Sequence, residues 1–146
     1  MNAVDNMVCF SLYSASRATT QAYRRLLKPW DLTYPQYLVL VSLWSEGPLS
    51  VGALGETLDL DSGTLSPLLR RLDSVGLVMR TREAPDERVV TVSLTERGLA
   101  LRDEMSSLPL QVASCMNLTP AAATALLGTL QSYTNGIRQP HTLPIS

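Results

Sequence analysis

The stretch that decides the fold runs from residue 50 to residue 98 and reads SVGALGETLDLDSGTLSPLLRRLDSVGLVMRTREAPDERVVTVSLTERG. Ser50 can cap a short helix that ends near residue 58, and a second helix should start near Asp61 and end at Gly76. Two short helices joined by a few residues are typical of a helix-turn-helix. Residues 77–82 and 89–94 then alternate apolar and polar side chains around a polar turn, which predicts two strands. This order predicts a winged helix-turn-helix.

Helices are expected on both sides of this stretch. Apolar residues recur at steps of four and three over residues 6–28, and Thr33 can cap a further helix. After the strands, Thr95 opens a helix that Pro109 interrupts, a second piece runs past Cys115, and a last helix ends near residue 137. Residues 139–146 contain two prolines and are expected to be disordered. We therefore expect one domain, mainly α with a small β-hairpin wing: about 34–94 form the winged helix-turn-helix, between terminal helices at about 6–28 and 95–138.

Composition narrows the function classes. The chain has 146 residues, a formal net charge of -1, 45% hydrophobic and 17% charged residues, which are typical of a globular domain. No apolar run is long enough to cross a membrane and no signal peptide is apparent, so we expect a cytoplasmic protein without a membrane partner. His141 is the only histidine, which argues against a Ser-His-Asp site or a metal site. We expect neither a metal nor a cofactor.

The second helix of the pair is the candidate DNA-reading element. Such a helix enters the major groove with its first residues toward the base edges. The candidates are Ser62, Gly63, Thr64 and Ser66 at its start and Arg70 and Arg71 about two turns later, where guanidinium groups can reach phosphates or guanines. At the wing, Arg88 suits a narrow minor groove, and Asp86 could hold its guanidinium or stabilise the turn.

Cys9 lies near the start of the first helix, where unpaired backbone N–H groups favour a thiolate. It shares one helical face with Tyr13, Ser16, Thr20 and Tyr23, and tyrosine hydroxyls could stabilise the sulfur anion. Such a thiolate can react with a peroxide to give a sulfenic acid that a second thiol traps, and Cys115 is the other thiol of the chain. On residues alone, both cysteines could equally be small buried hydrophobes.

Two sets of residues resemble known proteins. Asp86-Glu87-Arg88 followed by Val92-Ser93-Leu94-Thr95-Glu96-Arg97-Gly98 resembles the wing signature of the MarR-type regulators. That resemblance implies a homodimer whose terminal helices interlock, binding double-stranded operator DNA. The runs at residues 9–17, at Tyr23, at 32–38 and at 60–69, Pro67 included, resemble the organic hydroperoxide resistance regulators, with that proline in the recognition helix.

The second resemblance implies a repressor whose oxidant is an organic hydroperoxide. In it Cys9 is the peroxidatic cysteine, Tyr23 and Tyr34 come to the thiol from the partner subunit, and Tyr13 is a further candidate. The late position of Cys115 resembles the two-cysteine subclass, in which the sensing cysteine forms a disulfide with the late cysteine of the other subunit and DNA is released.

Three other interpretations stay open at this point. A thiol peroxidase would use the same cysteine and turn over with a reductant, but it has no need of a wing. A regulator of the same family controlled by a small phenolic or lipophilic ligand would leave Cys9 as packing. A helical interaction module without DNA binding would give Arg70, Arg71 and Arg88 no role.

Overall fold

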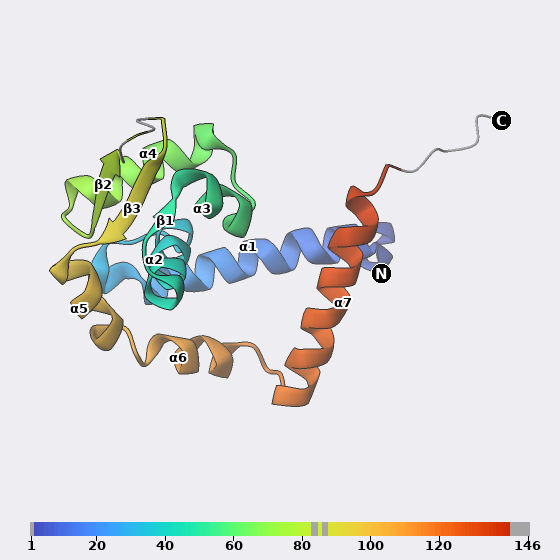
Figure 1. Ribbon diagram of the computed structural model, residues 1–146. Helices are drawn as coiled ribbons and strands as arrows, with labels where there is room; N and C mark the ends of the chain where they lie inside the picture. Colours follow the sequence, from blue (N-terminus) through green and yellow to red (C-terminus); the bar gives the residue numbers. More distant parts are fainter. Residues whose placement is uncertain (1, 83–84, 86–87, 141–146) are drawn as a thin grey trace. The chain divides into compact units, whose positions relative to one another are not determined.

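Helices form most of the chain in the computed structural model, which describes residues 2–82, 85 and 88–140 (Figure 1). The chain forms two compact units, Met1–Leu108 and Pro109–Ser146. In chain order the elements are η1 (Ala3–Asn6), α1 (Val8–Leu26), η2 (Lys28–Trp30), α2 (Tyr34–Glu46), β1 (Leu49–Ser50), α3 (Val51–Leu58), α4 (Ser62–Ser74), β2 (Val78–Arg82), β3 (Val90–Leu94), α5 (Glu96–Glu104), α6 (Leu108–Cys115) and α7 (Pro120–Arg138).

The helix starts follow from capping residues. A side-chain oxygen just before the helix accepts a backbone N–H that has no partner inside it. Five side chains do this, at donor–acceptor distances from 2.7 to 3.4 Å: Thr33, Ser50, Asp61, Thr95 and Thr119. Asp61 is the shortest of them, accepting from the N–H of Thr64 at 2.7 Å. The predicted start of the second helix near residue 61 is therefore confirmed, and α4 continues through Pro67.

The sheet has one more strand than we predicted. Both predicted strands are confirmed as β2 and β3, and in addition Leu49 and Ser50 form β1, which pairs antiparallel with β3 opposite Val92 and Thr91. The strand order is β1-β3-β2, so the predicted hairpin is extended on the β3 side. A two-residue strand shows no alternation, and its pairing partner lies more than 40 residues later in the chain, which is why the pattern alone did not reveal it.

The core of the first unit lies between the sheet and helices α2, α3, α4 and α5. Its fully buried side chains are mostly leucine: Leu40, Leu43, Leu54, Leu65, Leu69, Leu72, Val78, Val92 and Leu101. In addition, the indole N–H of Trp44 donates to the Gly98 carbonyl at 2.9 Å, which joins α2 to α5. This packing fixes α4 against the sheet and leaves its outer face in solvent.

Several boundaries differ from the expectation. Helix α1 is shorter at both ends than 6–28, with short 3-10 turns on each side. The break predicted at Pro109 comes earlier, after Glu104, and Pro109 lies instead in the first turn of α6, where its missing N–H leaves no helical bond unmade. Helix α6 ends at Cys115 rather than beyond it. Most of the tail expected to be disordered, residues 141–146, lies outside the described residues.

The long helices α1 and α7 have no buried residue. On α1, Val8 and Tyr13 are more than half exposed, as is Met7 just before it, and on α7 so are Leu127 and Ile137. Within the described ranges, no single helix is long and apolar enough to cross a membrane; α6 and α7 reach that length and composition only together, and they are bent by 86°.

Candidate nucleic-acid interface and thiol site

The residues on the outer face of α4 are mostly small and uncharged. Gly63, Pro67, Arg70 and Ser74 follow at steps of four and three, so they share the side of the helix opposite the buried leucines. All four are exposed. Among the described residues, no ion pair involves Arg70. Small side chains allow the helix to approach a partner surface closely, and Arg70 is the cation on that face.

Arg71 lies on one flank of α4, away from Arg70, and it is paired. Its guanidinium donates to the carboxylate of Asp31 at 3.2 Å. Asp31 follows η2 in the left-handed conformation, with φ 52°, and is 91% exposed. Thr64 lies on the same flank, seven residues before Arg71, and its N–H is used by the Asp61 cap. The two arginines that the sequence grouped together therefore occupy different environments.

The other flank of α4 faces the wing. Arg80 of β2 donates to Asp73 of α4 at 2.9 Å, and both side chains are partly exposed. Ser62 and Ser66 lie on this flank as well, at positions that share a face with Asp73. Both flanks of the helix thus carry an arginine–carboxylate pair.

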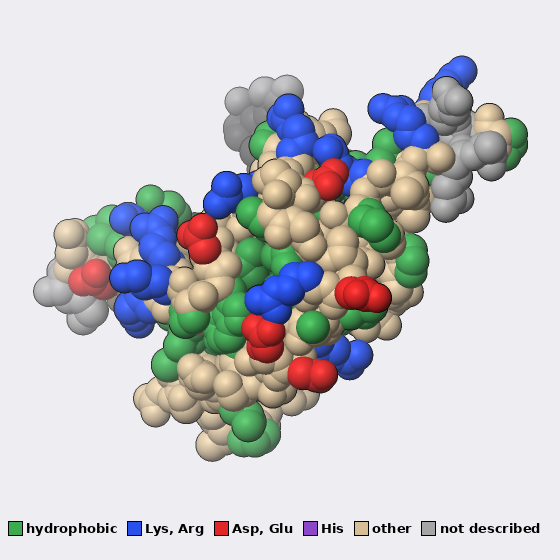
Figure 2. Space-filling model, turned by 90° about the vertical axis from the view of Figure 1, so that its left-hand side faces the viewer, with side chains coloured by type: hydrophobic (Ala, Val, Ile, Leu, Met, Phe, Trp, Pro, Cys, Tyr) green, Lys and Arg blue, Asp and Glu red, His purple; other side chains and the backbone are tan. Residues whose placement is uncertain are grey.

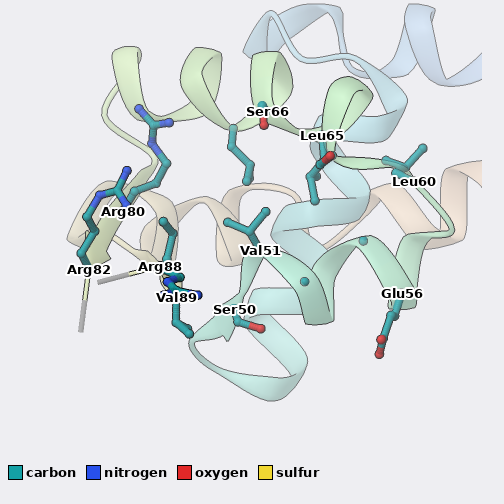
Figure 3. A pocket seen from close by; sticks show the side chains of 15 residues that line it. Ser50, Val51, Glu56, Leu60, Leu65, Ser66, Arg80, Arg82, Arg88 and Val89 are labelled. Carbon is teal, nitrogen blue, oxygen red and sulfur yellow. The ribbon is translucent and has the colours of Figure 1, made fainter. Parts of the chain in front are cut away.

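A hollow of about 820 Å³ lies between this flank, α3 and the strands (Figure 3). Arg80, Arg82 and Arg88 lie together on its wing side, and Glu56 of α3 lies at the opposite end. Its floor is apolar and includes Leu65 and Val89. Arg88 is placed by the structure on this exposed wing surface, whereas Asp86, its expected partner, lies outside the described residues. Three arginines thus line one end of the hollow, and one of them, Arg80, is paired with Asp73 in the last turn of α4.

The charge on the face drawn in Figure 2 is mixed. Figure 2 shows blue basic and red acidic side chains interspersed on one face, with hydrophobic side chains between them. This agrees with the net charge of -1 and indicates that attraction to an anionic partner depends on local arginines rather than on a continuous basic surface.

Cys9 and Tyr23 lie at opposite ends of α1. Cys9 is in the first turn of the helix and is exposed, whereas Tyr23 is in its last turn. Fourteen residues of α-helix separate them, a rise of roughly 21 Å along the axis. No hydroxyl of Tyr23 can therefore reach Cys9 of the same chain. Tyr13 is one turn from Cys9, and the Arg17 guanidinium lies 5.6 Å from the centre of its ring.

The tyrosines themselves form a cluster. The rings of Tyr23 and Tyr34 are stacked with centroids 4.1 Å apart, and Tyr37 joins them at 5.8 Å from Tyr23. Burial, together with the smaller effects of the neighbouring Tyr34 and Tyr37, raises the pKa of Tyr23 to about 12. Burial also raises the pKa of Tyr34. These phenols keep their protons at neutral pH and can donate hydrogen bonds to an anion.

Cys115 is the last residue of α6 and is exposed. It belongs to the second unit, and Cys9 belongs to the first. The pairing of the two cysteines stays a prediction.

Sequence reasoning did not single out Asp31, Asp73 or Tyr37. Asp31 is 40 residues from Arg71 along the chain, and no local pattern links the two. Arg80 and Arg82, by contrast, lie two positions apart in a predicted strand, so their position on one face of the wing could have been deduced from the alternation.

The comparisons with known proteins agree with this geometry. A family model for the transcriptional regulators SarA/Rot matches residues 21–105. The HTH-type transcriptional regulator TtmR of Methylorubrum extorquens is 48% identical over 130 residues, which cover 89% of this chain and 67% of the relative. The organic hydroperoxide resistance transcriptional regulator of Bacillus subtilis is 46% identical over 106 residues, covering 73% of this chain and 72% of that protein.

Solved structures of AbfR of Staphylococcus epidermidis share the fold. Reduced AbfR bound to DNA has a TM-score of 0.78 at 33% identity, with 92% of this chain and 95% of that chain covered. Disulfide-formed AbfR has a TM-score of 0.64 at 36% identity, with 90% and 92% covered. With a winged helix-turn-helix in place and relatives of this identity along most of its length, the chain belongs to the MarR family of transcriptional regulators, which are not enzymes.

Proposed function

We propose that this protein is a homodimeric repressor that binds operator DNA when reduced and releases it when an organic hydroperoxide oxidises Cys9. The observation that carries the proposal is the place of Cys9, an exposed thiol in the first turn of a helix, where backbone N–H groups stabilise an anion. The relative from Bacillus subtilis, named for organic hydroperoxide resistance, supports the choice of oxidant.

DNA is contacted by α4 and the wing. The small side chains of Gly63 and Pro67 let α4 approach base edges in the major groove, and Arg70 reaches a phosphate or a guanine from the same face. Ser62 and Ser66 add hydroxyl donors beside them, and Arg88 extends the contact to the neighbouring minor groove. In a dimer, two such helices read successive major grooves about 34 Å apart. The DNA-bound structure of AbfR is the supporting comparison.

Two features support a second copy: the exposed apolar side chains of α1 and α7, and the distance between Cys9 and Tyr23. Large apolar side chains are exposed on both helices, among them Val8 and Tyr13 of α1 and Leu127 and Ile137 of α7, and exposed apolar surface of this kind marks an interaction site. The roughly 21 Å between Cys9 and Tyr23 along α1 means that Tyr23 can support the thiolate only from another chain. Two α1 helices packed antiparallel would place Cys9 of each copy beside the tyrosine cluster of the other.

The chemistry proceeds in two balanced steps. The Cys9 thiolate attacks one peroxide oxygen, so that an S–O bond forms, the O–O bond breaks and the leaving alkoxide takes a proton to become an alcohol. Cys9 is then a sulfenic acid, oxidised by two electrons. The thiol of Cys115 from the second copy attacks this sulfur, an S–S bond forms, and water leaves with the thiol proton. Tyr23 and Tyr34 donate hydrogen bonds to the thiolate before the first step.

Release of DNA follows from a shift between two arrangements of the dimer. An intersubunit disulfide holds the terminal helices in positions that the reduced dimer rarely adopts. The distance between the two recognition helices then no longer matches the distance between successive major grooves. Only the difference in stability between these arrangements can drive the change.

The test is binding of the purified protein to the DNA upstream of its own gene, before and after one equivalent of cumene hydroperoxide. The unchanged protein should lose binding, Cys9→Ser should keep it, and a dimer band on a non-reducing gel should require Cys115. If every variant still binds after oxidation, peroxide sensing is wrong, and a MarR-type regulator controlled by a small ligand is left.

A further inference from the structure

The arginines around the recognition helix are not equally available to DNA. On one flank of α4, Arg71 is 3.2 Å from the Asp31 carboxylate, and on the other flank Arg80 is 2.9 Å from Asp73. Arg70, on the outer face between them, takes part in no ion pair of the described residues. The arrangement leaves one uncompensated cation on the outer face of the helix.

These pairs have little effect on folding but a direct effect on the surrounding field. Exposed ion pairs contribute little to stability, because water screens them and both side chains lose freedom. The attraction that a phosphate feels is reduced, however, because the field of an arginine is largely cancelled by an opposite charge about 3 Å from it, and more completely as the distance to the phosphate grows. Phosphate contacts supply nearly all of the sequence-independent affinity that a regulator has for DNA. A carboxylate beside a flanking arginine therefore removes part of that affinity.

We propose that Asp31 and Asp73 are specificity-determining residues that restrain sequence-independent DNA binding by neutralising Arg71 and Arg80. The inference rests on the proposed DNA-binding function and adds to it the reason why acidic groups stand beside the recognition helix. It also fits the net charge of -1, since both observations limit attraction of the protein to bulk DNA. The rival possibility is that Asp31 orients Arg71 toward a phosphate and so strengthens binding.

Asparagine is the suitable replacement at both positions. At position 31 the backbone has φ 52°, a left-handed conformation that asparagine tolerates as well as aspartate does. At position 73 it preserves the shape of the side chain within the helix. Asp103→Asn is the matched control, because Asp103 is an exposed acid of α5 that belongs to none of the described ion pairs.

The experiment measures the equilibrium affinity of the reduced, full-length protein for a short duplex of scrambled sequence as salt is varied. Each phosphate gained steepens the logarithmic salt dependence by about 0.9, so one contact in each of two copies gives about 1.8. For Asp31→Asn and for Asp73→Asn, the gain in affinity should therefore be roughly 12-fold larger at about 50 mM than at about 200 mM salt. Asp103→Asn should leave the slope unchanged.

The double variant Asp31→Asn/Arg71→Gln separates the two possibilities. If Asp31 neutralises Arg71, removing both charges should return the slope to that of the unchanged protein, whereas Arg71→Gln alone should make it shallower. The proposal is overturned if Asp31→Asn weakens binding or changes the slope no more than Asp103→Asn does, or if the double variant is shallower than the parent. Failure of the unchanged protein to bind any duplex would refute the proposed function itself, which is a different result.

Discussion

A mixed dimer can decide whether the sensing site is built between two copies. One chain carries Cys9→Ser and the other Tyr23→Phe, and two different affinity tags allow the heterodimer to be purified. All chains also carry Cys115→Ser, so that oxidation stops at the sulfenic acid. This dimer retains one Cys9, on the chain that lacks the Tyr23 hydroxyl.

The expected result follows from the helix length. Cys9 and Tyr23 of one chain are roughly 21 Å apart along α1, far beyond hydrogen-bond distance. If the tyrosine comes from the other copy, the remaining Cys9 faces an intact Tyr23 and should react at the rate of the Tyr23-containing parent. If it came from the same chain, the thiol would react as slowly as in the Tyr23→Phe homodimer. Loss of one hydrogen bond to a thiolate slows its reaction on the order of tenfold.

The rate can be followed by quenching the reaction with cumene hydroperoxide at successive times, trapping the sulfenic acid and measuring its fraction by mass spectrometry. Tyr13→Phe in place of Tyr23→Phe is the control, because Tyr13 is one turn from Cys9 on the same helix and acts within its own chain. A heterodimer rate equal to that of the Tyr23→Phe homodimer would refute the shared site. A Tyr23→Phe homodimer as fast as the parent would refute any role for this hydroxyl.

Three further predictions concern stability. Leu72→Ala removes a fully buried side chain of α4 and should lower the free energy of unfolding by about 2–5 kcal/mol, whereas Leu99→Ala, more than half exposed, should change it by no more than about 0.5 kcal/mol, both measured by urea denaturation. Gly98→Ala should cost about 1–3 kcal/mol, because a Cβ there would overlap the Leu77 carbonyl oxygen. Gly128→Ala in α7 would meet nothing within 4 Å and should not lower the melting temperature. The folded protein holds the Tyr23 proton more tightly than the unfolded chain does, so stability should fall as pH rises from 10 to about 12. Tyr23→Phe should reduce that fall, and equal slopes in both proteins would contradict the raised pKa.

The parts of this fold that could be predicted are those coded by neighbouring residues. A cap needs only a hydroxyl or carboxylate three residues before an N–H, and Thr33, Ser50 and Thr95 were identified in that way. The Cys9 position and the order of helices and wing strands have the same local origin.

The parts that could not be predicted depend on contacts between distant segments. Arg70 and Arg71 are adjacent and equivalent in the sequence, and only the fold, which brings Asp31 beside Arg71, gives one of them a carboxylate partner. Tyr37 is a buried residue of α2, and only its contact with Tyr23 of α1 makes it part of the tyrosine cluster. Strand β1 exists because β3 pairs with it, so nothing within its two residues could reveal it.

The absence of buried residues on α1 has a consequence for how the protein responds to its own abundance. The first turns of this helix contain no buried residue, so packing gives their backbone hydrogen bonds little protection against opening and exchange with solvent. These turns are therefore more ordered in the dimer than in the monomer. Dilution, which dissociates the dimer, should allow them to fray. Because Cys9 lies on that segment, a dilute pool of protein should hold a less organised thiol than a concentrated one. Copy number in the cell would then set the threshold at which oxidant is detected, and native-state hydrogen exchange across a dilution series would reveal it.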